Sequence, residues 1–156
     1  MGERTQRRNG HMTGMRGVYL TAAELTKGGL IVSPTSRSSF GADLLVTDEK
    51  CKKAWSVQVK TNYGRPKFWL FSKHSKQTAS PSHVYVLVNL CRSNAKQTKL
   101  YPSPDFYVVP SRIIARRLRT TPRKTGAIFY SIQVRDIDRY KERWSVFGKR
   151  AWSSAS

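Results

Sequence analysis

The chain has 156 residues, 38% of them hydrophobic, and a net charge of +20 from 29 lysine and arginine residues against 9 aspartate and glutamate residues. This length suits one domain with a two-layer core, the apolar fraction argues against wholesale disorder, and no run approaches the roughly 18 apolar residues of a membrane-spanning helix. The charge favours a polyanionic partner, and nucleic acid comes before a membrane surface because each phosphate contact releases counterions.

The chain begins with a polar segment. Residues 1–14 lack the apolar core of a secretion signal, so we expect a flexible basic arm and a cytoplasmic protein. Apolar positions at helical intervals then predict a helix from Met15 to Gly28, where two glycines end it. A single domain is expected over residues 15–148, followed by a frayed tail at residues 149–156.

Strands dominate the middle of the chain. Short strands are predicted at residues 30–36 and 42–47, and a polar turn joins the second of these in a hairpin to a strand at residues 54–61. The mixed segment that follows has strand character only at residues 67–71. Residues 83–90 form the most apolar run of the chain and predict a buried central strand.

The last third alternates strands and helices. The predicted order is a strand at 105–110, a helix at 110–119, a basic loop at 120–126, a strand at 127–134 and a helix at 136–148. Together the elements predict an α/β (α+β) fold around a central sheet. Cys51 and Cys91 are isolated from each other and from histidine pairs, so neither zinc nor a disulfide framework is expected.

The predicted hairpin brings three polar side chains together. If its turn is centred between Lys50 and Cys51, Asp43 lies across from Gln58 on the same face. Lys60 lies two residues beyond Gln58 and shares that face, whereas the alternate leucines and valines face the core.

These groups suit phosphodiester hydrolysis. The Asp43 carboxylate, the Gln58 side-chain carbonyl and the backbone carbonyl of Val59 are oxygen ligands of the kind that Mg²⁺ prefers. The metal would polarise a phosphate and activate water, and Lys60 would orient that water or neutralise developing charge. The alternative is a cross-strand salt bridge and hydrogen bond of little energetic value.

The segments "GAD" (Gly41 to Asp43) and "QVK" (Gln58 to Lys60), joined by a hairpin, resemble the PD-(D/E)XK nuclease superfamily. The preceding helix with Glu24 is similar to that of its small endonuclease-like and Holliday-junction-resolvase-like members. The resemblance implies a restriction-endonuclease-like core: helix, three mixed or antiparallel strands, helix, strand, with helices flanking a central mixed sheet.

The resemblance also implies magnesium-dependent DNA cleavage, with Mn²⁺ as a substitute metal and no organic cofactor. It makes Asp43 a metal ligand, places Gln58 at the second acidic position, makes Lys60 the catalytic lysine and Glu24 a further acid and ligand. A homodimer is expected by analogy, because cutting both strands of DNA requires two sites.

Two residues depart from the motif. Ala42 stands where the motif has proline, and Gln58 replaces the usual acid, which removes one negative charge from the site. A catalytically inactive nucleic-acid-binding protein with the same fold is therefore the alternative function. A near copy, "SIQVR", places Gln133 and Arg135 on one face but has no carboxylate opposite, so it is interpreted as an ordinary sheet strand.

Two further groups of residues are candidate DNA contacts. One is the loop before Asp43, and the other is one face of the helix predicted at 110–119, although a generic polar loop and a solvated basic face are the alternatives. The candidates are Ser36, Arg37 and Ser38 in the loop and Arg112, Arg116 and Arg119 on the helix.

Overall fold

The computed structural model describes residues 2–36, 41–64, 66–90, 103–123 and 125–148, and for residues 2–9 the backbone alone. The strands are β1 (Ile31–Pro34), β2 (Leu44–Thr47), β3 (Ala54–Tyr63), β4 (Phe68–Phe71), β5 (His83–Leu90), β6 (Asp105–Pro110), β7 (Arg119–Pro122) and β8 (Ile128–Gln133). The helices are α1 (Gly2–Lys27), α2 (Ser111–Arg117) and α3 (Val134–Ile137), with 3-10 turns η1 (Lys73–Lys76), η2 (Asp138–Tyr140) and η3 (Trp144–Phe147).

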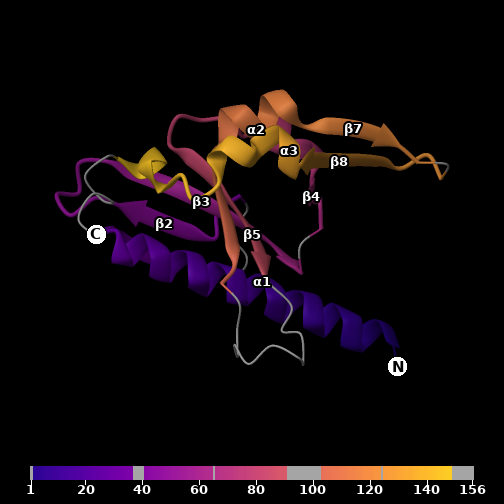
Figure 1. Cartoon of the computed structure of the whole chain (residues 1–156), viewed down its shortest axis with the longest axis horizontal. Helices are drawn as coiled ribbons and strands as arrows, with labels where there is room; N and C mark the ends of the chain where they lie inside the picture. Colours follow the sequence, from indigo (N-terminus) through magenta and orange to yellow (C-terminus); the bar gives the residue numbers. More distant parts are fainter. Residues whose placement is uncertain (1, 37–40, 65, 91–102, 124, 149–156) are drawn as a thin grey trace.

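The strands form two sheets. The main sheet has the order β1-β2-β3-β5-β6, in which β3 and β5 run parallel and the other neighbours run antiparallel. A second, antiparallel sheet has the order β4-β8-β7. Figure 1 shows α1 on one side of the main sheet and α2 and α3 on the other. The α/β (α+β) fold with a central mixed sheet and flanking helices is thus confirmed.

Strand β5 holds the two sides of the molecule together. All eight of its residues are buried, as its uninterrupted apolar sequence predicts for a strand covered on both faces. Because side chains alternate along a strand, Val84, Val86 and Val88 enter one core cluster, and Tyr85 and Leu87 enter another.

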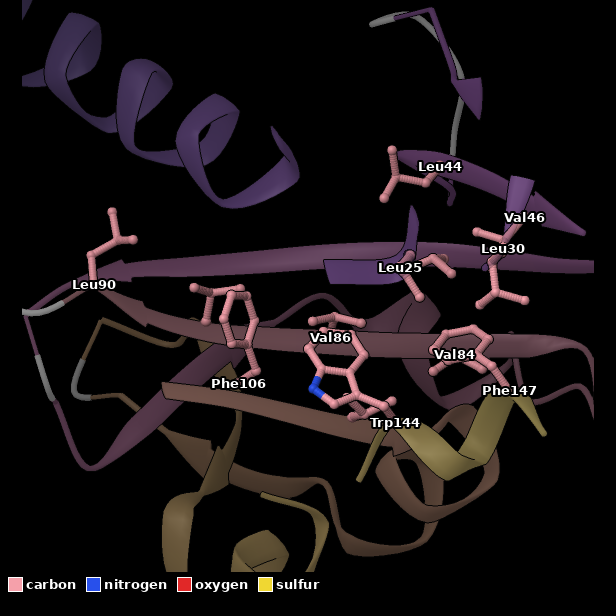
Figure 2. Close-up of a cluster of buried hydrophobic side chains, with 13 residues drawn as sticks. Leu25, Leu30, Leu44, Val46, Val84, Val86, Leu90, Phe106, Trp144 and Phe147 are labelled. Carbon is pink, nitrogen blue, oxygen red and sulfur yellow. The ribbon is translucent and has the colours of Figure 1, made fainter. Parts of the chain in front are cut away.

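The first cluster lies between the main sheet and α1 (Figure 2). Leu25 of α1 packs there with Leu44 of β2 and Val57 of β3. From η3, Trp144 contacts the ring of Phe106 on β6, and Phe147 contacts the ring of Trp55 on β3. None of the described helices has the length and apolar character needed to cross a membrane.

The second cluster fills the opposite face of the main sheet. Ile114 and Leu118 of the α2 region pack there with Trp69 of β4 and Ile132 of β8. The spacing of Ile114 and Leu118 opposite the arginines predicts that both point inward, and both are buried. Val57 of β3 belongs to the first cluster, so the even-numbered residues of β3 lie on the opposite face of the main sheet. The second sheet covers that face.

Four predictions about helices and strands differ from the structure. Helix α1 begins at Gly2 instead of Met15, so the expected arm has a helical backbone. The crossover from β3 to β5 contains β4 and η1 where the resemblance implies a helix, and α2, which follows β6, covers that face. Part of the loop predicted at 120–126 is strand β7, because it pairs with β8.

The fourth error is the helix predicted at 136–148, which is broken into α3, η2 and η3. The chain turns at Glu142, whose φ of 50° interrupts any helix. The break is required because Ile137 and Tyr140 belong to the second cluster, whereas Trp144 and Phe147 belong to the first. One straight helix does not reach both faces of a sheet.

Candidate active site on the β2–β3 hairpin

The β2–β3 register agrees with the register expected from the sequence. Leu44 lies opposite Val57 and Thr47 lies opposite Ala54. The turn between the strands is closed by Asp48, whose carboxylate accepts hydrogen bonds from the backbone N–H groups of Lys52 and Lys53 at 2.7 and 3.2 Å. A side-chain acceptor inside the turn holds the two strands at one alignment.

Asp43 lies just before β2 and adds a side-chain hydrogen bond to the backbone hydrogen bonds that join β2 to β3. Its backbone N–H donates to the Val57 carbonyl at 2.8 Å, and its Oδ2 atom accepts a hydrogen bond from the Val59 N–H at 2.7 Å. Since the N–H and C=O of a strand residue point toward the same neighbouring strand, the Val59 carbonyl is also directed to the Asp43 side of β3. The carboxylate is thus fixed against the backbone of the "QVK" segment.

Lys60 is half-buried on the face of β3 that meets the second sheet. Its Nζ atom lies 5.2 Å from the centroid of the Phe71 ring. Burial lowers the pKa of Lys60, and the negative charge of Asp43 opposes that shift. Asp43 and Lys60 therefore interact electrostatically, but the described ion pairs do not include this couple. A lysine with a depressed pKa near a carboxylate is a common feature of catalytic sites.

Gln58 lies between these two positions in the sequence and shares the face of Lys60. Its side chain is half-buried and has no hydrogen-bond partner among the described residues. The side-chain carbonyl of Gln58 is therefore available to a ligand. We refer to Asp43, Gln58, Val59 and Lys60 together as the hairpin site.

A hollow of about 480 Å³ opens beside Lys60, between β3 and β4. Phe68 and Leu70 line it and are about half exposed, at 47% and 51%. Asn62 supports this wall, because its Nδ2 atom donates to the Phe68 carbonyl at 3.1 Å and to Asn89 Oδ1 at 3.2 Å. Sequence reasoning missed Asn62, although its place two residues after Lys60 on a strand put it on the same face.

Glu24 lies on α1, which packs on the opposite face of the main sheet from Gln58 and Lys60. Its carboxylate lies 4.0 Å from the Nζ of Lys27. No described hydrogen bond or ion pair joins Glu24 to the hairpin site. Its role as a further metal ligand stays a prediction.

The structure separates the expected DNA contacts. Ser36 is exposed just after β1, and Arg37 and Ser38 lie outside the described residues. Arg112 and Arg116 are exposed on α2.

The predicted basic face fails at Arg119, because α2 ends at Arg117 and Arg119 begins β7. Arg119 instead pairs with Asp136, donating from Nη2 to Oδ1 at 2.8 Å and from Nε to Oδ2 at 2.9 Å. This bidentate pair lowers the pKa of Asp136 and raises that of Arg119.

Comparison with known proteins adds no family to this geometry. No model of a known protein family matches the chain, and no curated protein matches it in sequence. The function is therefore argued from the site.

Proposed function

We propose that this protein is a magnesium-dependent DNA endonuclease of the PD-(D/E)XK type that hydrolyses phosphodiester bonds at the hairpin site. The observation that carries the proposal is the fixed position of the Asp43 carboxylate against the Val59 backbone, with Lys60 close enough to respond to its charge. The net charge of +20 supports DNA as the partner.

The donor set fits Mg²⁺. Asp43 has one carboxylate oxygen held by the Val59 N–H, which leaves the other for a cation. The Val59 carbonyl and the Gln58 side-chain carbonyl add two neutral oxygens, and Mg²⁺ commonly combines one or two carboxylates with several waters. Bound there, the metal would polarise the scissile phosphate and lower the pKa of a water.

Each residue has a distinct role in hydrolysis. Asp43 and the Val59 carbonyl bind the cation and so position the phosphate, while Gln58 supplies a weaker, uncharged ligand. Lys60 donates hydrogen bonds to the water and to a phosphate oxygen, which stabilises the charge that grows as the water oxygen bonds to phosphorus and the leaving oxygen departs. Burial against Phe71 excludes water and strengthens this interaction.

The alternative is a nucleic-acid-binding protein that has the fold without cleavage. One observation favours it: Gln58 stands where the motif has an acid, which removes a negative charge from the site. We further propose that the protein is a homodimer, since cutting both DNA strands needs two sites. We also propose that it acts in the cytoplasm.

The decisive experiment incubates supercoiled plasmid, linear duplex and a four-way junction with Mg²⁺ or Mn²⁺. We expect metal-dependent cleavage that falls by about 100-fold or more in Asp43→Asn and in Lys60→Met. The control is the Gln133→Ala, Arg135→Ala double variant of the near-copy motif, which we expect to cleave normally. Cleavage that persists in both site variants would exclude the assigned site.

Gln58→Glu separates the two candidate functions. A restored carboxylate strengthens metal binding, so the Mg²⁺ concentration for half-maximal cleavage should fall by about 10-fold. Wild-type protein that cleaves no substrate while Gln58→Glu does would identify the natural chain as the binding-only form. Absence of cleavage in both would contradict the nuclease proposal.

A further inference from the structure

A second hollow, of about 500 Å³, lies where β5 begins and β6 ends, away from the hairpin site. Its lining includes Ser80, Pro110, Arg112, Arg139, Tyr140 and Arg143, together with one further serine and four apolar residues. We call this cavity the basic hollow. Three guanidinium groups line one cavity although they come from α2, η2 and the turn after η2.

No described carboxylate pairs with these arginines. Glu142 is engaged elsewhere, since its Oε1 accepts from the Phe106 N–H at 3.2 Å and its Oε2 from Trp144 Nε1 at 2.8 Å. Asp136 is paired with Arg119. Asp138 precedes Arg139 in the chain but forms no ion pair with it in the described structure. Among the described residues, no carboxylate forms an ion pair with the arginines of the basic hollow.

Tyr140 organises two of the three arginines. Its side chain is 6% exposed and belongs to the second core cluster, so the ring is fixed. Arg139 donates from Nη2 to the Tyr140 hydroxyl at 3.0 Å. The guanidinium carbons of Arg139 and Arg143 lie 5.0 and 5.5 Å from the ring centroid. Cation–π contacts of this kind hold the charges in place without neutralising them.

We propose that the basic hollow binds a phosphate group of the backbone of the same DNA that is bound at the hairpin site. Guanidinium groups match phosphate oxygens in geometry as well as charge, and three of them around one cavity have no other described anion to bind. The proposal rests on the proposed function for the identity of the partner, but it concerns binding and does not require cleavage.

The distance between the two sites suits one DNA molecule. Strands β2 and β6 are separated by β3 and β5, so roughly 14 Å of sheet lies between β2, next to Asp43, and β6, next to the basic hollow. Measured along the helix axis of B-DNA, this span is about four base-pair steps, so one duplex can reach both sites. A contact at that distance fixes the direction of the DNA across the sheet, which a single site does not.

The test compares two variants of equal charge. One variant replaces Arg112, Arg139 and Arg143 by glutamine. Its control also introduces three glutamines, in place of the exposed lysines of the β2–β3 turn, Lys50, Lys52 and Lys53. Binding of a fluorescent duplex is measured by anisotropy in EDTA over a range of salt concentrations. We expect the arginine variant to lose about 10-fold more affinity than the lysine variant, with a salt slope smaller by about one unit.

Equal losses in the two variants would overturn the proposal, because net charge alone would then account for them. Arg112→Gln provides a second test that leaves Tyr140 and its contacts intact, and we expect it to weaken binding by about 3-fold. Unchanged binding in this variant would also count against the basic hollow. The two proposals fail separately, because the anisotropy assay in EDTA measures binding without cleavage: wild-type protein that cleaves no substrate, while the arginine variant still loses affinity as expected, would contradict the nuclease proposal alone.

Discussion

At the scale of single residues, the hairpin site combines groups that do not favour folding. Lys60 is placed in a half-buried position beside an aromatic ring, and burial lowers its pKa. The nearby carboxylate of Asp43 offsets part of this cost but is itself committed to the Val59 N–H. A side chain that burial penalises is better explained by chemistry than by stability.

The first prediction follows from this burial. Lys60→Met keeps the length of the side chain and removes the charge, so we expect a melting temperature equal to or a few degrees above that of the wild type at pH 7, with cleavage lost. The folded-state pKa of Lys60 lies below its ordinary value of 10.5, so between these two values the unfolded chain binds more protons. Wild-type stability therefore rises with pH in that window, and the advantage of Lys60→Met should shrink there.

Thermal melts of the two proteins from pH 7 to pH 10 check this expectation. The matched control is Lys53→Met in the β2–β3 turn, where the lysine is exposed. Its difference from the wild type should stay constant over the same range. A Lys60→Met protein that is strongly destabilised at pH 7 would indicate that the lysine has a structural role.

At the scale of elements, local patterns predicted the parts of the fold that depend on neighbouring residues. The β2–β3 register followed from the turn, and the burial of β5 followed from its apolar run. Ile137, Tyr140, Trp144 and Phe147 stand at helical spacing within residues 136–148, which predicts one buried face, and all four are buried. This spacing does not reveal that the first two and the last two pack on opposite faces of the sheet, because periodicity reports burial without its direction.

The same limit applies to the candidate DNA contacts. Arg119 was placed on a helical face by its spacing from Arg112 and Arg116, yet the helix ends earlier and Asp136 pairs with Arg119. Local sequence contains no signal for a partner 17 residues away. The sequence does not predict the basic hollow either. It predicts one continuous helix through Arg139 and Arg143, whereas the structure breaks the chain between them and brings both side chains to one cavity.

The second prediction concerns the contact of α1 with β3. A Cβ atom added at Gly17 would overlap Thr61 Oγ1 and lie 2.8 Å from Thr61 Cβ. We therefore expect Gly17→Ala to destabilise the protein by about 2 kcal/mol, since overpacking typically costs 1 to 3 kcal/mol. The measurement is chemical denaturation monitored by circular dichroism.

Gly14 and Gly10 on the same helix are matched controls, because an added Cβ at either position meets nothing within 4 Å. Alanine there should stabilise the protein by about 0.5 to 1 kcal/mol through its lower backbone entropy in the unfolded chain. Equal effects at Gly17 and Gly14 would show that α1 does not approach β3 as closely as the structure has it.

At the scale of the whole molecule, the proposed chemistry and the proposed binding depend on different properties. The hairpin site is local, since Asp43, Gln58 and Lys60 lie within one hairpin. DNA capture is global, because the net charge of +20 is spread over the chain and the basic hollow joins residues from separate elements. Salt screens long-range attraction strongly and buried contacts weakly.

The third prediction follows from this difference between capture and chemistry. If six or more phosphates are neutralised on binding, affinity for DNA should fall by about 1,000-fold or more between about 50 and about 200 mM salt. In steady-state cleavage the loss should appear as a higher KM with kcat changed by less than about 2-fold, because screening weakens substrate and transition state equally. Initial rates over a range of duplex concentrations measure both constants. A kcat that falls in parallel with affinity would show instead that the exposed charges act in the chemical step itself, which is incompatible with a reaction carried by the half-buried Lys60.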